Sequence, residues 1–596
     1  MSEKEIAWDL SEIFPSCDHP TVSEMVEALK KKAEELVVDY KGKINTPEFS
    51  AQKLRDLLGK QEEILIDMES LEVFSYNSFH ANMTLPETKA LYSKIREFET
   101  EISKQLAFID LEIGKLVYEK KELLEEPPLL SYKHFLEKIR RAFPHLLSEV
   151  EEQLILEKDQ FGIKAWSQLQ STWLNTRTFK VMVEGEEQEL SYGDANALIT
   201  HPDRGTRIST NKAIYGLLGN NEDIFSSALR SICGDWVNNS KRRKYNSPMH
   251  QSLISNDTSL IIIDNLMKTI EDNVSIYQNY LQIKAKIMKL PKLSCADVVA
   301  PLNGTTSKKY SWDQTKELIL QILTEFNEEF ASYVIDMYDK NHVDASTRFG
   351  KTNGGYCSPW YKGKTAYILM SYTGKMDEIN TLIHEFGHSI HNYLAAQEQS
   401  YHNYYSGSTV AEIASTFGEL LLTDHLLTRA ESPQEKVTIL ARVLDGAGMA
   451  IFQVSARVWF EQSLYNAVEK GEHLDGKNIS KFWCASRDKI YGDSVEWFDE
   501  MIWEWTMKPH YYMPNRRYYN YPYVYAQLFV YALYQIYKKD KADFVPKFRK
   551  ILSSGGSLSP KELGQIIGLD ITKPDFWQLG IKQYEEFVNE LEQLMN

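Results

Sequence analysis

Paired cysteines are missing from this chain. Its 596 residues include five cysteines, an odd number, and no two of them form a Cys-x-x-Cys pair. This excludes a zinc-finger framework and a disulfide-stapled secreted domain. Because unpaired thiols are typical of a reducing compartment, we expect a cytoplasmic protein with free thiols at Cys17, Cys233, Cys295, Cys357 and Cys484.

Positive charge and long apolar runs are also scarce. Lys and Arg number 67 against 84 Asp and Glu, which gives a formal net charge of −17. Such a surface repels phosphate groups, so we expect no nucleic-acid partner. The N-terminus has no basic segment followed by an apolar one, and no uninterrupted apolar run reaches about 18 residues. The sequence therefore predicts neither a leader peptide nor a membrane partner.

Amphipathic helical patterns fill most of the chain. Apolar residues recur at three- and four-residue spacing among charged ones, which predicts a mainly α fold. The apolar fraction of 43% is ordinary for a globular protein. The predicted helical windows are Glu24–Tyr40, Lys53–Met68, Glu87–Leu123, Tyr132–Lys158 and Ser259–Leu290, with a last helical block from about Ser432 to the C-terminus.

Two stretches predict β-structure instead. Thr178–Tyr192 alternates apolar and polar residues around Gly185, which is typical of a hairpin. Thr347–Gly374 is rich in glycine and contains an apolar, β-prone run, Ala366–Tyr372. We therefore expect a small sheet there. The hairpin is followed by a loop, which favours a domain boundary near residue 200.

The sharpest chemical pattern is His384-Glu385-Phe386-Gly387-His388, an HExxH sequence. Positions four apart on a helix lie one turn apart on the same face, so His384 and His388 can hold one Zn²⁺. Glu385 lies beside them and is the candidate general base. A helical glycine such as Gly387 predicts the close approach of another backbone.

A catalytic zinc needs a third protein ligand and an open position. His391 lies two turns from His384, about 10 Å along a helix, which is too far to share one ion easily. Glu412 follows on a separate predicted helical segment and is favoured as the third ligand. Glu419 stands seven residues later on nearly the same face. It suits a carboxylate that orients a ligand histidine, with a structural or solvated Glu as the alternative interpretation.

Together these motifs resemble the thimet oligopeptidase/oligoendopeptidase F family of zinc metallopeptidases, and most of all its oligoendopeptidase F branch. The resemblance covers nearly the whole chain. The matching phrases are HEFGHSIH at 384–391, VAEIASTFGE at 410–419, RFGKTNGGYC at 348–357, YILMSY at 367–372, KPHYY…YPYVYAQ at 508–527, WDLSEIFPS at 8–16 and DRGTR at 203–207.

The resemblance implies a large, bowl-like multi-helix metallopeptidase with a deep channel and a small β-sheet beside the zinc helix. One zinc per chain is then held by His384, His388 and Glu412, with Glu385 as the base. From the hairpin and the loop that follows it, we expect residues 1–200 to form an N-terminal helical domain that ends in a β-hairpin, and residues 201–596 to form the catalytic helical domain. Ala366–Tyr372 is then expected to offer an edge strand to an extended peptide.

The family also uses tyrosines and a histidine of a late loop to hold the scissile carbonyl. His510, Tyr523 and Tyr525 match here, whereas the Gln-Tyr that follows in the family does not. A phenol stays protonated near neutral pH and can donate to a developing oxyanion. The alternative for each tyrosine is simple packing in the core.

The sequence thus predicts a zinc-dependent endopeptidase that hydrolyses internal bonds of short, unstructured peptides in the cytoplasm. One alternative is an HExxH carboxypeptidase, in which Arg516 or Arg517 binds the terminal carboxylate of the substrate. A second is a non-catalytic helical peptide-binding protein without stoichiometric zinc. The glycines of 350–355 are not a phosphate loop, because the GxxxxGK[ST] pattern is absent.

Overall fold

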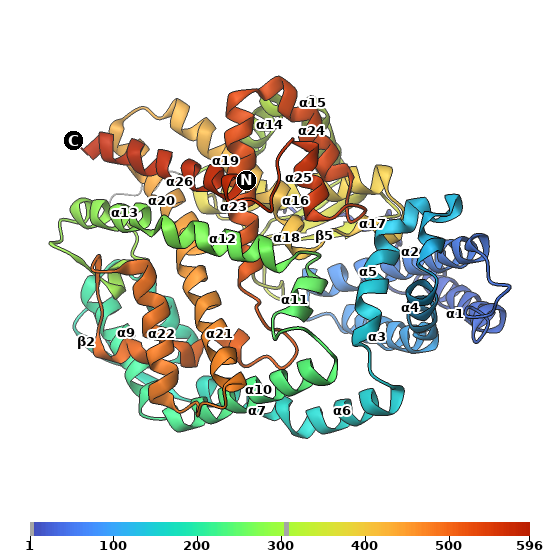
Figure 1. Cartoon of the computed structure of the whole chain (residues 1–596). Coiled ribbons are helices and arrows are strands. Elements are labelled where there is room, and N and C mark those ends of the chain that lie inside the picture. Colours follow the sequence, from blue (N-terminus) through green and yellow to red (C-terminus); the bar gives the residue numbers. More distant parts are fainter. Residues whose placement is uncertain (1–4, 303–308, 596) are drawn as a thin grey trace. The chain divides into compact units, whose positions relative to one another are not determined.

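The computed structural model describes residues 5–302 and 309–595 (Figure 1). Residues 1–4 lie outside these ranges. The prediction of no leader peptide depends in part on them. The chain divides into two compact units. Unit 1 comprises residues 1–144, 307–426 and 536–570, and unit 2 comprises residues 145–306, 427–535 and 571–596. The division of the chain near residue 200 stays a prediction about its domains.

Unit 1 is built mostly of helices, which confirms the predicted fold class for this part of the chain. Apolar stripes at helical spacing, such as Leu54, Leu57 and Leu58 on α2, face a common core. The helices are α1 (Pro20–Tyr40), α2 (Ala51–Ala81), α3 (Pro86–Leu106), α4 (Phe108–Glu119), α5 (Lys133–Ala142), α14 (Trp312–Phe326), α15 (Glu328–Asp339), α16 (Met376–Glu398), α17 (Tyr401–Tyr404), α18 (Ser408–Ala411), α19 (Ile413–Arg429), α24 (Lys541–Ser553) and α25 (Pro560–Ile566).

A three-stranded sheet accompanies these helices in unit 1. Its strands are β4 (Val343–Asp344), β5 (Tyr356–Trp360) and β6 (Thr365–Leu369), in the order β4-β6-β5. β6 pairs in parallel with β4 and antiparallel with β5. The predicted small sheet is therefore present. The prediction that Ala366–Tyr372 forms an edge strand is wrong, because β6 is the central strand and all its residues are buried.

Unit 2 is also mainly helical. Its strands are β1 (Thr178–Val183) and β2 (Glu186–Ser191), which form the predicted hairpin, and the short pair β3 (Leu293–Ser294) and β7 (Val495–Glu496). Its helices are α6 (Glu149–Phe161), α7 (Ile163–Asn175), α8 (Tyr192–Ala197), α9 (Arg204–Gly219), α10 (Glu222–Arg242), α11 (His250–Ser255), α12 (Leu260–Asp272), α13 (Val274–Ile287), α20 (Pro433–Gly448), α21 (Val454–Glu469), α22 (Gly476–Tyr491), α23 (Tyr521–Lys539) and α26 (Pro574–Met595).

Three predicted helical windows are interrupted. The window Glu87–Leu123 breaks at Ala107 between α3 and α4, and Ser259–Leu290 breaks at Asn273 between α12 and α13. The window Tyr132–Lys158 is interrupted between α5 and α6, where the chain passes through Pro144. Helix α6 then begins with a capping box formed by Ser148 and Glu151. Apolar periodicity runs through these breaks because both helices bury the same kind of face.

One helical segment of the described residues, Pro433–Glu469, meets the length and composition expected of a membrane span. It joins α20 and α21, and half of its most apolar window is buried within the protein. On α13, Tyr280 donates to the Ala441 carbonyl and Lys284 pairs with Asp445 at 2.8 Å. Burial in the core therefore accounts for its apolar composition.

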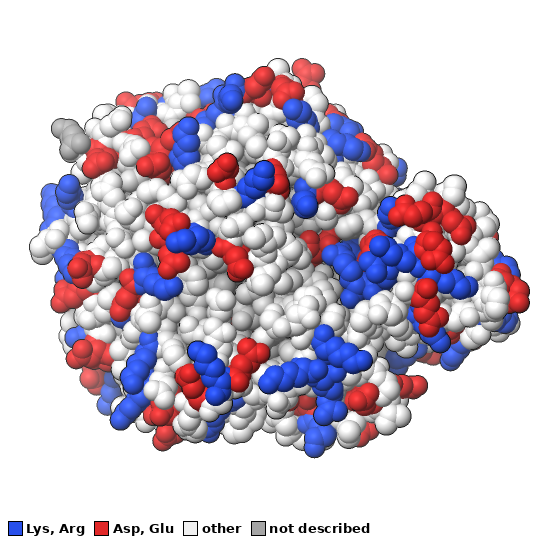
Figure 2. Space-filling view, viewed as in Figure 1, with Lys and Arg blue, Asp and Glu red and all other residues white. Residues whose placement is uncertain are grey.

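On the face in Figure 2, acidic and basic side chains are interspersed.

Candidate metal centre

The helix that carries the HExxH sequence, α16, begins with a well-satisfied turn. The Glu378 carboxylate accepts hydrogen bonds from the backbone N–H groups of Thr373, at 2.6 Å, and Lys375, at 3.0 Å. Asp377 and Glu378 thus place acidic groups at the positive end of the helix dipole. A buried stripe that includes Ile383, Phe386 and Ile390 fixes which face of α16 points into the core.

The glycines of the two motifs set the distance between α16 and α19. A Cβ on Gly387 would lie 2.5 Å from the Ala414 carbonyl oxygen, and one on Gly418 would lie 3.1 Å from the Ile383 carbonyl oxygen. The predicted close approach of another backbone to Gly387 is thus confirmed. The approaching backbone is the start of α19, directly after Glu412.

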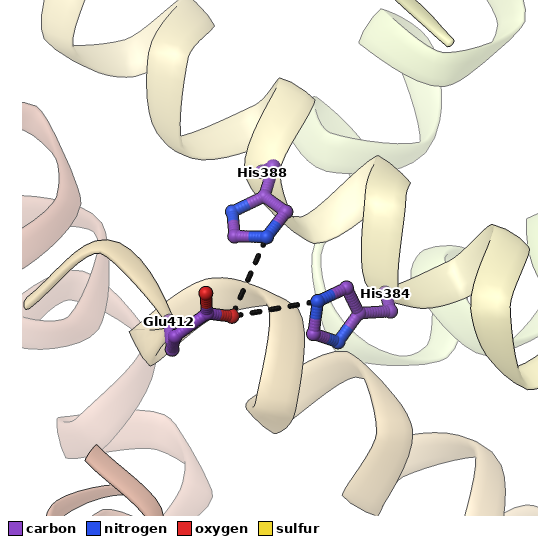
Figure 3. Close-up of side chains that lie close together, drawn as sticks. All are labelled: His384, His388 and Glu412. Carbon is purple, nitrogen blue, oxygen red and sulfur yellow. Dashed lines mark ion pairs between the residues drawn. The ribbon is translucent and has the colours of Figure 1, made fainter. Parts of the chain in front are cut away.

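Three side chains from these two segments converge (Figure 3). Glu412 lies between α18 and α19, and its Oε2 is 3.4 Å from Nε2 of His384 and 3.4 Å from Nε2 of His388. The two imidazole rings are nearly perpendicular, with centroids 4.9 Å apart. Among the described residues, this is the group of His, Cys, Asp or Glu side chains with metal-binding spacing.

Glu412 is held as a carboxylate. Burial disfavours its charge, but the hydrogen bond with His388 and the charges of both histidines hold the pKa of Glu412 at about 2. The Ser415 hydroxyl donates to Glu412 Oε2 at 2.8 Å. Near neutral pH the cluster therefore offers one anionic oxygen between two imidazole nitrogens.

Glu419 selects the tautomer of His384. Its Oε1 lies 2.6 Å from Nδ1 of His384, so Nδ1 carries the proton and donates. Nε2, on the other side of the ring, faces Glu412, and it holds the lone pair that a metal needs when His384 is neutral. This contact is the one that the spacing of Glu419 predicted.

Glu385 is buried beside the cluster and does not join it. Its side chain is 7% exposed, and burial raises the pKa of Glu385 despite the charges of His388 and His384, which lower it. The nearby backbone N–H of Cys357 on β5 also lowers the pKa of Glu385 slightly. A carboxylate whose pKa is shifted toward neutrality is better matched to proton transfer.

His391 lies on the same helix but apart from the metal-binding group. It is buried, and burial lowers the pKa of His391 to about 4. The Ala411 carbonyl, in the residue before Glu412, raises this pKa only in small part. The structure therefore brings Glu412 to His384 and His388, as the spacing argument favoured, and leaves His391 as a core residue.

The tyrosines and the histidine of the late loop belong to unit 2. The Tyr519 and Tyr523 hydroxyls hydrogen-bond at 2.5 Å, and the Tyr519 ring lies 5.9 Å from that of His510. Tyr523 is 45% exposed, whereas Tyr525 is fully buried against Phe529 and Trp577. Tyr519 is not among the residues that the sequence predicted for this role, because it precedes α23 and no helical spacing links it to Tyr523.

Two buried charged residues hold this late loop. Arg517 donates to the carbonyls of Tyr511, at 2.7 Å, and Met513, and it is almost inaccessible to solvent. Glu461 accepts the backbone N–H of Tyr518 at 2.8 Å, where Tyr518 has the unusual φ of +54°. Arg517 is therefore committed to the loop. Arg516 is exposed and stacks on Tyr519.

Comparison with known proteins places these motifs in a common context. The model of Peptidase family M3 matches residues 197–583, and that of Oligopeptidase F matches residues 119–179. Oligopeptidase PepF of Bacillus subtilis is 27% identical over 601 residues, which is 99% of this chain and 87% of that protein. Group B oligopeptidase PepB of Streptococcus agalactiae is 25% identical over 603 residues, 100% of this chain and 98% of that protein.

Solved structures share the fold. A candidate peptidase from Chlamydophila abortus has a TM-score of 0.87 at 24% identity, covering 100% of this chain and 99% of its own. Oligoendopeptidase-F from Enterococcus faecium has a TM-score of 0.68 at 22% identity, covering 96% of this chain and 98% of its own. At these identities the likeness is one of fold, and it agrees with the mainly helical architecture.

Proposed function

Because the chain belongs to Peptidase family M3, it is a metallo-endopeptidase, and we propose that its metal is a single Zn²⁺ and its substrates are short, unstructured peptides. Its relatives carry the names oligopeptidase and oligoendopeptidase. We further propose that it works in the cytoplasm, in keeping with its unpaired cysteines.

The convergence of His384, His388 and Glu412 is the observation that carries this proposal. Zinc bonds to histidine nitrogen and carboxylate oxygen are about 2.0–2.2 Å long, so two ligand atoms of a tetrahedral ion lie about 3.3–3.5 Å apart. Both distances from Glu412 Oε2 to the imidazoles are 3.4 Å. The donor set also fits, since two imidazoles and one carboxylate leave a fourth position open.

Each of the protein's own groups has a defined task in this proposal. When bound, zinc supplies a Lewis acid for the scissile carbonyl and makes water a better nucleophile. The Glu385 carboxylate accepts the proton of the attacking water and then delivers it to the nitrogen of the leaving amine. Glu419 holds His384 by Nδ1, which would leave Nε2 free to bind the metal.

We propose Tyr523 as the donor to the oxyanion, with His510 and Tyr519 as its neighbours. The exposed hydroxyl of Tyr523 supports this role, whereas Tyr525 is enclosed by aromatic rings. The role itself comes from the resemblance of 508–527 to the family. The predicted bowl-like shape and deep channel likewise stay predictions.

The alternatives gain less support. A carboxypeptidase needs a cation for the terminal carboxylate of its substrate. Arg517 is buried and bound to backbone carbonyls, which leaves the exposed Arg516, stacked on Tyr519, as the candidate of the two. A non-catalytic peptide-binding protein would have no use for Glu385 beside an intact ligand set.

The test is cleavage of end-blocked peptides, with and without a chelator, read by mass spectrometry. We expect internal cleavage that the chelator abolishes and that stoichiometric zinc restores. Cleavage of free-ended peptides only would favour the carboxypeptidase. Equal kcat/KM for a ten-residue peptide and for the long unfolded protein that contains it would contradict the preference for short substrates.

A further inference from the structure

Ser415 places a hydroxyl group beside the third residue of the metal-binding group. It is a fully buried serine in the first turn of α19, three residues after Glu412. Its Oγ lies 2.8 Å from Glu412 Oε2 and 3.1 Å from the backbone carbonyl oxygen of Glu412. A hydroxyl has one proton to donate. Because hydrogen bonds to a charged acceptor are the shorter and stronger ones, the carboxylate is the favoured partner.

The oxygen that accepts this hydrogen bond is the one that faces both histidines. Glu412 Oε2 is 3.4 Å from Nε2 of His384 and 3.4 Å from Nε2 of His388 (Figure 3). The Glu412 side chain is 36% exposed, so packing restrains it only in part. Its several rotatable bonds allow other positions of the carboxylate. The hydroxyl of Ser415 therefore restrains the very atom that would bind the metal.

Ser415 is itself fixed against the helix that carries the histidines. A Cβ on Gly387 would lie 2.5 Å from the Cα of Ser415. Gly387 stands in α16 between His384 and His388. Contacts thus lead from α16 to the backbone of Ser415, from its hydroxyl to Glu412, and from Glu412 back to both imidazoles. All of these residues belong to unit 1.

A purely local role is the alternative for this serine. Serines in helices often donate to a backbone carbonyl of the preceding turn, and the contact with the Glu412 carbonyl fits that habit. Ser455 on α21 shows the local role alone, since it is fully buried and donates to the Ile451 carbonyl at 2.6 Å. Ser415 differs because its shorter contact is with a side-chain carboxylate. Ser455 is therefore a matched control.

We propose that Ser415 is a positioning residue of the metal centre, whose hydroxyl holds the Glu412 carboxylate with Oε2 between the two imidazoles. It acts through Glu412 and takes no part in the chemistry. This inference rests on the proposed zinc site, because it names a residue that orients one of the ligands of that site.

The experiment measures zinc affinity of the metal-free protein by competition with a chromogenic chelator. Ser415→Ala removes the hydroxyl and keeps the Cβ, and it should bind zinc about 10–100-fold more weakly, as expected when a partner of a ligand is lost. Ser415→Thr keeps the hydroxyl and should stay within about threefold of the wild type. Ser455→Ala should leave zinc affinity unchanged. Wild-type affinity in Ser415→Ala would overturn the proposal.

A double-mutant cycle separates positioning of Glu412 from a local role of the serine. In the Glu412→Ala background no carboxylate remains to be held, so Ser415→Ala should change zinc affinity less than about twofold. An equal loss in both backgrounds would overturn the proposal. So would a lower melting temperature of metal-free Ser415→Ala with unchanged zinc affinity, since the hydroxyl would then serve only the helix.

The same measurements distinguish this inference from the proposed function. A wild type that cleaves blocked peptides, beside a Ser415→Ala variant with full zinc affinity, would refute the role of Ser415 alone. A wild type that binds zinc and cleaves no blocked peptide, beside a Ser415→Ala variant with weakened zinc binding, would refute the endopeptidase and leave the role of Ser415 standing. Absence of stoichiometric zinc binding in the wild type would overturn both.

Discussion

Gly387 and Ala414 touch so closely that no side chain fits between them. A Cβ on Gly387 would lie 2.5 Å from the Ala414 carbonyl oxygen. Gly387 stands between the two histidines of α16, and Ala414 is two residues after Glu412. The contact therefore fixes how near the segment carrying the carboxylate comes to the helix carrying the imidazoles.

Gly387→Ala should push these segments apart. Forcing a methyl group into such a contact costs about 1–3 kcal/mol, and the shift would separate Glu412 from His384 and His388. We expect a lower melting temperature and weaker zinc binding, measured by calorimetry and by competition with a chromogenic chelator. Gly59→Ala on α2, where a Cβ meets nothing within 4 Å, is the matched control and should be neutral or stabilising. Unchanged zinc affinity in Gly387→Ala would contradict this account.

Glu385→Gln should separate metal binding from catalysis. The amide keeps the size of the side chain and removes the proton acceptor, so turnover should fall by several orders of magnitude. Zinc content, measured by atomic emission, should stay near one per chain. More than a tenth of the wild-type activity in this variant would show that another group is the base.

Alanine variants of Glu412, Glu419 and His391 should differ in how much zinc affinity they lose. Glu412→Ala removes a ligand atom and should lose zinc affinity most. Glu419→Ala leaves the ligands and releases the His384 tautomer, with an expected loss of about 10–100-fold in affinity or activity. His391→Ala should keep zinc, because its ring lies outside the group. Dialysis against graded zinc buffers gives the ranking, and greater loss in His391→Ala than in Glu412→Ala would replace the third ligand.

The two tyrosines of the late loop should respond differently to loss of a hydroxyl. Tyr523→Phe should lower kcat about 10²–10³-fold with little change in KM, as expected of a contact made in the transition state. Tyr525→Phe should stay within about threefold of the wild type, because its hydroxyl is buried and has no hydrogen-bond partner among the described residues. Tyr519→Phe tests the neighbour that hydrogen-bonds to Tyr523. Wild-type kinetics in both Tyr523→Phe and Tyr519→Phe would direct attention to His510.

Glu461 should make stability depend on pH in the direction unusual for a carboxylate. Burial raises the pKa of Glu461 to about 7, although Arg517 and the Tyr518 N–H lower it. The folded state therefore holds the proton more tightly than the unfolded state. Stability from this group is present below about pH 4.5 and is lost as the pH rises through about 7. Glu461→Gln should remove this loss, by roughly 1–3 kcal/mol between pH 5 and 8. Denaturant titrations at both pH values measure it, and parallel behaviour of the two proteins would refute it.

The local features of the site were predictable from sequence. On a helix, two histidines four residues apart share one face, and the helix geometry also fixes where Glu385 lies beside them. Glu412 could be favoured over His391 because two helical turns are too long for one ion. Glycine destabilises a helix relative to alanine, so Gly387 indicated that another backbone packs closely against the helix there. Distances along one helix are sufficient for these features, whereas the meeting of Glu412 with the two histidines also depends on a second segment.

Long-range neighbours were decided by the tertiary structure. The run Ala366–Tyr372 is apolar on both faces, a pattern of a central strand, and only the pairing with β4 and β5 shows that it is not an edge. The breaks at Ala107 and Asn273 occur where apolar periodicity continues, because two helices bury similar faces. Tyr523 and Tyr525 are equivalent in the sequence and differ completely in exposure.

The sequence by itself determined the helical fold class and the placing of the two histidines of the HExxH sequence on one helix face, because these follow from residue spacing within single helices. The tertiary structure decided which backbone meets Gly387, which strand is central and which tyrosine is exposed. These depend on contacts between segments far apart in the chain, where many pairings satisfy the same local pattern. Packing of the whole core selects one of them.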